Sequence, residues 1–208
     1  MRWLIATHNR DKVLEIKAIF ADMSVELLDL EDFPEIGPIA ETGTTLQENA
    51  LQKARYVHRV TGMPAIADDT GLEVAALDGG PGVYSARFAG EQVTYSQNYE
   101  KLLKEMEQVP DNQRGAHFRT CAAYVDDERE LTAEGMVEGM ITREPLGTNG
   151  FGYDPVFLVD GSGQTFGQMT AAQKQSISHR ARAFEALHQL LARSLPRNEN
   201  KETLAQTH

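Results

Sequence analysis

The first 23 residues constrain the fold more than any other segment, because a strand pattern passes directly into a helix pattern. Residues 3–6 form a short apolar run followed by polar residues, which is typical of a buried strand. Over residues 12–23, apolar residues then recur at the spacing of an amphipathic helix, namely Val13, Ile16, Phe20 and Met23. A strand that leads straight into a helix indicates an α/β protein.

The rest of the chain alternates in the same way and then becomes rich in strands. Thr45 and Glu48 have the spacing of a capping box, which predicts the start of a second helix. Its buried stripe is Leu46, Ala50, Ala54 and Val57. Further strands are predicted at residues 25–30, 64–69 (ending in two acidic residues), 71–77, 117–125, 131–141 and 156–159, and further helices at 95–106 and from Thr170 onward. We therefore expect a long mixed central sheet flanked by helices.

Composition limits the classes of partner. The 208 residues carry 31 acidic and 20 basic side chains, a formal charge of −11, which repels a nucleic-acid backbone and predicts no nucleic-acid partner. No segment approaches the roughly 20 apolar residues that span a bilayer, so we expect no membrane contact. One cysteine, Cys121, excludes an internal disulfide and favours the cytoplasm. A small polyanion could still bind, provided that a few cations and a metal gather in one cleft.

The first candidate cluster follows the first strand and opens the first helix. It consists of Thr7, His8, Asn9, Arg10, Asp11 and Lys12. Backbone N–H groups at a helix start, together with a hydroxyl, an amide and a lysine, suit a phosphate. The alternative is an ordinary helix start in which Asn9 caps the helix and Lys12 is solvated.

The second cluster is the carboxylate pair Asp68 and Asp69, followed by Thr70 and Gly71. Carboxylates at the C-terminal end of a strand often hold Mg²⁺, which prefers hard oxygen ligands. A carboxylate that remains free can accept a proton from water. The alternative is an Asp-rich turn before Gly71.

The third cluster is the loop segment Phe151, Gly152, Tyr153 and Asp154, which Gly150 precedes. Two glycines around Phe151 let the backbone approach a flat ligand on which the ring could stack, and Asp154 would accept a hydrogen bond from a sugar or base. The alternative is a tight turn whose rings enter the core.

The fourth cluster contains Lys174, Ser178, His179 and Arg180. Lys174 and Ser178 are four residues apart and could share a helical face. His179 and Arg180 fall at a bend or helix start, where forked donors can meet a phosphate or carbonyl. The alternative is a solvated basic face.

Isolated polar residues complete the set. Glu41 could be a remote metal ligand, and Lys53 could reach a phosphate or water. Cys121 is expected in the core. We expect His58, His117 and His188 to be structural or solvated, because no partner cluster surrounds them in the sequence.

Taken together, these segments resemble the inosine/xanthosine triphosphate pyrophosphatases, which remove aberrant purine nucleotides from the nucleotide pool. The matching stretches are THNRDK, ETGTTLQENALQKA, IADDTGLEVAALDGGPGVYSARFAG, NGFGYDPVF and AAQKQSISHRARAF, between residues 7 and about 184. The resemblance implies two lobes with the active-site cleft between them in one unit over residues 1–195, and a homodimer. Residues 196–208 form a polar tail that we expect to be mobile.

The resemblance also assigns roles. It implies Mg²⁺-dependent hydrolysis of ITP, dITP, XTP and dXTP to the monophosphate and pyrophosphate. Asp69 matches the proton acceptor and a magnesium ligand, Asp68 lies beside it as a further metal ligand, and Glu41 matches a second carboxylate at the metal. The residues that match substrate contacts are Thr7, Asn9, Lys12, Lys53, Thr70, Phe151, Gly152, Tyr153, Asp154, Lys174, His179 and Arg180, and His8, Arg10 and Asp11 lie within the first of these segments. Asp11 departs from the pattern, since glycine is common before the lysine.

Base selectivity would follow if His179 or Arg180 donated a hydrogen bond to the 6-oxo group, because adenine presents an amino group there. Two other hypotheses stay open. One is a related pyrophosphatase that acts on modified pyrimidine or methylated purine nucleotides. The other is a non-catalytic nucleotide sensor, against which the complete set of Glu41, Asp68, Asp69 and Lys53 argues.

Overall fold

The computed structural model describes residues 2–21 and 24–194, and in these residues seven strands form one mixed sheet. The strand order is β2-β1-β3-β5-β6-β7, and β4 pairs with β3 beside this path. Parallel pairs join β1 to β2 and to β3, whereas β3, β5, β6 and β7 pair antiparallel. The strands are β1 (Arg2–Ile5), β2 (Glu26–Asp29), β3 (Ala65–Val74), β4 (Pro81–Gly82), β5 (Gly115–Val125), β6 (Glu130–Ile141) and β7 (Phe157–Val159). The expected α/β sheet flanked by helices is confirmed.

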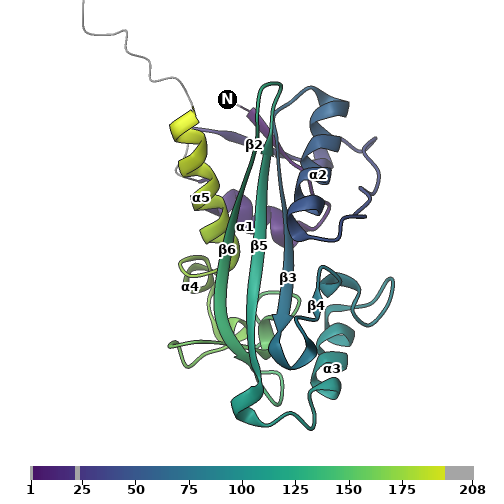
Figure 1. Cartoon of the computed structure of the whole chain (residues 1–208). Helices are drawn as coiled ribbons and strands as arrows, with labels where there is room; N and C mark the ends of the chain where they lie inside the picture. Colours follow the sequence, from purple (N-terminus) through teal and green to yellow (C-terminus); the bar gives the residue numbers. More distant parts are fainter. Residues whose placement is uncertain (1, 22–23, 195–208) are drawn as a thin grey trace, which may run out of the picture.

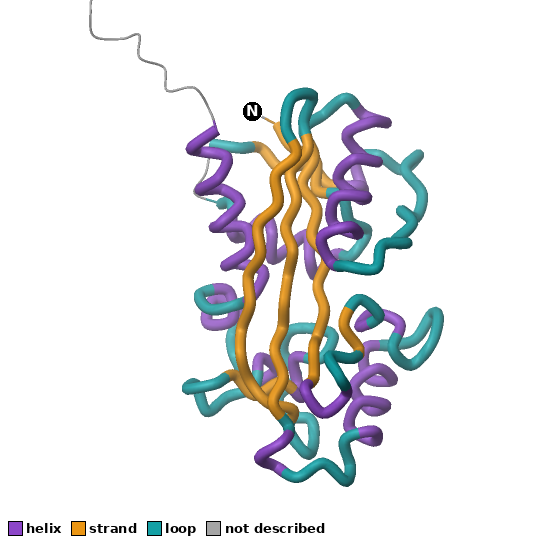
Figure 2. The backbone as a smooth tube through the Cα atoms, viewed as in Figure 1, coloured by secondary structure: helices purple, strands orange, loops and turns teal. Residues whose placement is uncertain are grey.

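Helices cover both faces of one half of the sheet (Figures 1 and 2). The helices are α1 (Arg10–Ile19), α2 (Leu46–Thr61), α3 (Tyr95–Glu105), α4 (Ala171–Gln175) and α5 (His179–Ser194). On one face α2 packs through its predicted stripe of four residues, all buried, against alanines of β3 and β5. On the other face, α1 and α5 pack against Ile66 and Ala122. The alanines let the helices approach the sheet closely.

The other half of the molecule surrounds the far ends of the long strands. There β4, α3 and β7 lie around a second core that includes Leu72, Leu102, Phe118 and Phe157. Because β3, β5 and β6 run through both halves, they connect the two cores directly. That residues 1–195 act as one unit stays a prediction.

One edge of β3 is open where the two halves meet. The strand β5 pairs with all of β3, from Ala65 to Val74. On the opposite edge, β1 pairs only with Ala65 and Ile66, and β4 pairs only with Leu72 and Glu73. Residues 67–71 therefore face a gap in the sheet between β1 and β4, and side chains from both faces of β3 can reach it.

One predicted boundary is wrong. The strand that contains Asp68 and Asp69 does not end there, because β3 continues to Val74 and the two carboxylates lie in its middle. After Thr170 the chain forms α4 and then α5, which begins at His179, where a bend or helix start was predicted; Lys174 and Ser178 are not in one helix, so the predicted shared helical face is wrong. The predicted first helix begins at Arg10, and Met23 and the tail 196–208 lie outside the described residues. Within the described residues, no helix is both long and apolar enough to cross a membrane.

Candidate active site

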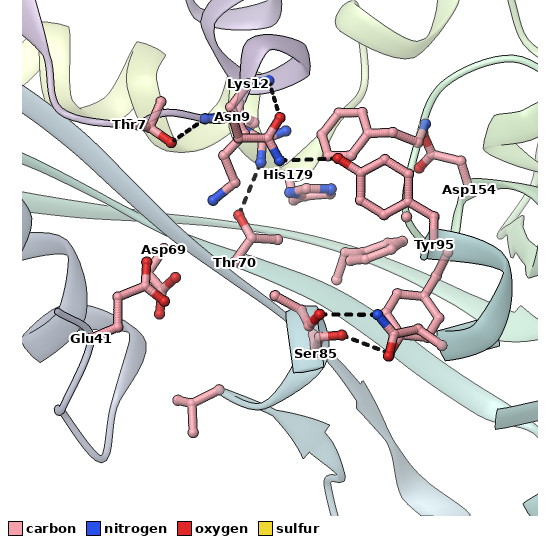
Figure 3. A pocket seen from close by; sticks show the side chains of 18 of the residues that line it. Thr7, Asn9, Lys12, Glu41, Asp69, Thr70, Ser85, Tyr95, Asp154 and His179 are labelled. Carbon is pink, nitrogen blue, oxygen red and sulfur yellow. Dashed lines mark hydrogen bonds between the residues drawn. The ribbon is translucent and has the colours of Figure 1, made fainter. Parts of the chain in front are cut away.

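The gap in the edge of β3 opens into a cavity of about 260 Å³ (Figure 3). Most of the residues that the sequence singles out line this cavity, although they come from segments far apart in the chain. The lining residues are Thr7, Asn9, Lys12, Glu41, Asp69, Thr70, Val83, Ser85, Ala86, Tyr95, Asn98, Phe118, Phe151, Gly152, Tyr153, Asp154, Lys174, His179 and Arg180.

The start of α1 forms one end of the cavity. Asn9 caps the helix, because its Oδ1 accepts a hydrogen bond from Lys12 N at 3.2 Å, and Asn9 N donates to Thr7 Oγ1. The capping interpretation is therefore right, yet Asn9 also lines the cavity. The alternative that Lys12 is solvated is wrong, since its Nζ lies 3.1 Å from the buried Asp68 carboxylate. This end offers a helix N-terminus and a sheltered ammonium group to an anion.

Asp68 lies behind the cavity and holds two cations. Its Oδ2 accepts hydrogen bonds from Arg180 Nη2 at 3.0 Å and Nε at 3.2 Å, and it pairs with Lys12. Burial alone would raise the pKa of Asp68, but Lys12 and Arg180 hold it well below its ordinary value. Its buried Oδ1 has no hydrogen-bond partner in the described part of the chain.

Asp69 points to the opposite face of β3, as strand alternation requires. Its Oδ2 accepts from Asn49 Nδ2 at 3.0 Å, and its Oδ1 lies 3.2 Å from Lys53 Nζ. Lys53 also contacts Glu41 Oε1 at 2.6 Å, and so joins two carboxylates that lie close together in Figure 3. Asn49 additionally holds Gly43 N, which fixes the loop that carries Glu41. Among the described residues, no three His, Cys, Asp or Glu side chains form a metal cluster.

The third cluster lies at the other end of the cavity. Asp154 is buried and accepts from Lys174 Nζ at 2.6 Å and from Phe151 N at 2.8 Å, so its carboxylate closes its own loop, and the residue also lines the cavity. Gly150 has a φ of +71°, and a Cβ there would collide with the Asp154 carboxylate. The Phe151 ring is half-buried, and Lys174 Nζ lies 4.7 Å from its centroid.

The fourth cluster is buried rather than solvated. Lys174 and Arg180 both pair with Glu15 of α1, a residue that no sequence pattern singled out. Arg180 thereby lies between Glu15 and Asp68. This network attaches the C-terminal helices to α1 across the base of the cavity.

His179, the first residue of α5, is also buried. Its ring stacks on Phe118 with centroids 4.7 Å apart, and its Nδ1 lies 2.7 Å from Thr120 Oγ1. Burial lowers the pKa of His179 well below its ordinary value, and the nearby charge of Arg180 adds to this effect. The imidazole is therefore neutral at pH 7.

Sequence reasoning missed several lining residues because they have no neighbouring chemical motif. Tyr95 begins α3, packs near Phe151, accepts from Asn9 Nδ2 and donates to Asp11 Oδ2 at 3.1 Å. This contact ties the unusual Asp11, which does not itself line the cavity, to a residue of the cavity wall. Phe118, Ser85 and Asn98 also line the wall.

Some predicted residues do not line the cavity. His8 contacts the Gly37 carbonyl, and Arg10 pairs with Glu31 on the surface. Lys53, Asp68 and Asp11 act on lining residues from behind or beside them. His117, which we expected to be structural or solvated, contacts Glu73 of the neighbouring strand, with its Nε2 2.5 Å from Glu73 Oε2.

Comparison with known proteins identifies the family. The model of the Ham1 family matches residues 3–190. A dITP/XTP pyrophosphatase of Thermoanaerobacter sp. is 48% identical over 94% of this chain and 98% of its own length, and one of Shigella flexneri is 44% identical over 88% and 94%. The structure of a HAM1 protein from Coxiella burnetii superposes with a TM-score of 0.84 at 38% identity, covering 93% of this chain and all of that one. With its cavity, its fold and these matches, the chain belongs to the Ham1 family.

Proposed function

We propose that this protein hydrolyses dITP, ITP and XTP to the nucleoside monophosphate and pyrophosphate. The observation that carries the proposal is that one cavity has a helix N-terminus with Lys12 at one end, an aromatic ring with buried cations at the other, and two carboxylates beside Lys53. These features suit a triphosphate, a flat base and a metal-assisted hydrolysis respectively. The names of the relatives as dITP/XTP pyrophosphatases agree with this arrangement.

The carboxylates of Glu41 and Asp69 fit Mg²⁺. Both are hard oxygen donors. Lys53 Nζ pairs with both carboxylates, so the space between them already holds one positive charge. Magnesium typically uses one or two carboxylates and completes its shell with substrate phosphates and water, so a third protein ligand is not required. When bound, it would neutralise charge on the phosphate oxygens. Asp68 was also predicted as a ligand, but its Oδ2 already pairs with Lys12 and Arg180, so we assign the metal to Glu41 and Asp69.

The protein's own groups then have separate tasks. The N–H groups at the start of α1 and the Lys12 ammonium bind the phosphates, and Lys53 offsets charge on the pyrophosphate that leaves. Asp69, which Asn49 and Lys53 hold in place, accepts a proton from the water that attacks the α-phosphorus. Phe151 offers its face to the base.

We propose further that the chain works in the cytoplasm as a homodimer. Its one cysteine is a buried free thiol, which fits a reducing compartment. The exposed Tyr84, in the loop of residues 83–88, offers an aromatic contact for the second chain.

The deciding experiment measures pyrophosphate release from ITP, XTP, GTP and ATP, first with Mg²⁺ and then with EDTA. We expect rapid release from ITP and XTP alone and loss of that release with EDTA. Release from a modified pyrimidine or methylated purine nucleotide instead would favour the related pyrophosphatase. No release from any nucleotide, with retained binding, would favour the sensor.

A further inference from the structure

A buried chain of hydrogen bonds runs from Asp68 through Thr70 and Thr120 to His179. Thr70 Oγ1 lies 3.0 Å from Asp68 Oδ2 and 2.7 Å from Thr120 Oγ1. Thr120 Oγ1 lies 2.7 Å from His179 Nδ1. Asp68, Thr120 and His179 are at most 3% exposed, so water does not compete for these bonds.

The direction of the chain follows from counting hydrogens. Asp68 Oδ2 faces Lys12 Nζ at 3.1 Å and Arg180 Nη2 at 3.0 Å, and because these groups can only donate hydrogen bonds, Oδ2 is an acceptor. Thr70 therefore gives its single hydroxyl hydrogen to Asp68 and accepts from Thr120. Thr120 then has no hydrogen left for His179, so Nδ1 must carry the proton and donate. The reverse direction would leave the contact between Thr70 and Asp68 without a hydrogen.

The far nitrogen of the ring is thereby fixed as an acceptor. A neutral imidazole has one N–H, so a proton on Nδ1 leaves Nε2 with a bare lone pair. Nε2 has no hydrogen-bond partner within the residues that the structure describes, and His179 lines the cavity. Stacking on Phe118 holds the ring in place.

We propose that the Asp68–Thr70–Thr120 relay makes His179 Nε2 a hydrogen-bond acceptor that selects purines with a hydrogen on N1. This inference rests on the proposed function and refines its base selectivity. The bases hypoxanthine and xanthine carry a hydrogen on N1 and would donate it to Nε2. Adenine has a bare N1, so two lone pairs would face each other. In this proposal His179 accepts a hydrogen bond from N1 of the base. The sequence analysis had instead considered that His179 donates a hydrogen bond to the 6-oxo group.

The first test reads the tautomer directly and needs no substrate. Two-bond ¹H–¹⁵N correlation spectra of the ¹⁵N-histidine-labelled protein at neutral pH should show His179 with a protonated Nδ1 and an unprotonated Nε2. His179→Gln identifies the signals by their disappearance. A proton on Nε2 in the unsubstituted protein would overturn the proposal.

The second test measures selectivity. Thr120→Val keeps the side-chain shape but removes the hydroxyl that accepts from His179 Nδ1, so the proton is no longer held on Nδ1. We expect the ratio of kcat/KM for ITP to that for ATP to fall by about tenfold or more, because a buried pairing is lost. Thr120→Ser should keep the high ratio, and Thr132→Val on the neighbouring strand is the matched control, since within the described residues the Thr132 hydroxyl has a hydrogen bond only with Gln47 Nε2.

An unchanged ratio in Thr120→Val would overturn the role of the relay in selectivity. Failure of the proposed function looks different: the unsubstituted protein would release no pyrophosphate from any nucleotide, while its His179 tautomer would still be measurable.

Discussion

Two adjacent residues of the same type can have different tasks when they lie in one strand, because their side chains point to opposite faces of the sheet. Asp68 and Asp69 point to opposite faces of β3, so Asp68 holds Lys12 and Arg180 whereas Asp69 faces Lys53 and the cavity. Spacing alone makes the two carboxylates equivalent, and only the family resemblance distinguishes Asp69. Under the proposed function, their environments leave Asp69 as the carboxylate that would meet water and the metal.

This division predicts the effect of substituting Asp69. Asp69→Asn keeps the size of the side chain but removes the charge that would accept a proton, so kcat should fall by about a hundredfold or more. Pyrophosphate release measures kcat, and thermal unfolding checks that the fold is retained. Asp160→Asn changes an exposed aspartate outside the cavity and serves as the control. Full activity of Asp69→Asn would rule out its assigned role.

At the scale of elements, the local signals in the sequence predict helices better than strands. The capping box at Thr45 and the buried stripe of α2 are both present. The continuation of β3 was not predictable, because consecutive polar residues from Asp68 to Thr70 look like a turn. Inside the strand, Asp68 is stabilised by ion pairs with Lys12 and Arg180, and Asp69 by an ion pair with Lys53. All three cations belong to other elements of the chain.

The same limit applies to the candidate site. The clusters at element boundaries were visible, since each contains several polar residues at short spacing. Glu15 and Tyr95 were not, because each acts through a partner more than 80 residues away. Periodicity and local spacing carry no information about such contacts.

The turn between β5 and β6 gives a pH prediction. Asp126 accepts from the Glu128 and Arg129 backbone N–H groups, the Arg129 guanidinium and the Tyr124 hydroxyl. Burial alone would raise the pKa of Asp126, but the hydrogen bond from Arg129 leads the contacts that lower it to about 2. Because the folded pKa is depressed, this stabilisation is present above about pH 4 and is lost as the pH falls toward 2.

Asp126→Asn should therefore lower the free energy of unfolding by about 2 kcal/mol at pH 7, and by less at pH 3. Urea unfolding at both pH values measures the difference. Glu128→Gln, in the same turn, should cause little change at either pH. An equal effect of Asp126→Asn at both pH values would contradict the electrostatic account.

At the scale of the whole molecule, the proposed homodimer can be tested through Tyr84. Its side chain is 59% exposed, and Arg87 lies 5.3 Å from its ring centroid. We expect light scattering to give twice the mass of one chain. Tyr84→Asp should shift the protein toward the monomer, because it replaces an apolar contact with a charge. Tyr56→Asp on α2 is the control, and a monomeric unsubstituted protein would contradict the proposal.

The gap in the edge of β3 also bears on self-association. An unpaired strand edge is normally a template on which another polypeptide can add, and such edges promote aggregation. Here the open stretch is confined to residues 67–71, with β1 and β4 at its two ends. An incoming strand would have to displace one of them to form a ladder of useful length. The unpaired stretch is therefore long enough to line a site for a small molecule but too short for a strand of another polypeptide to pair with. The protein can thus bind a ligand at this edge without promoting aggregation there.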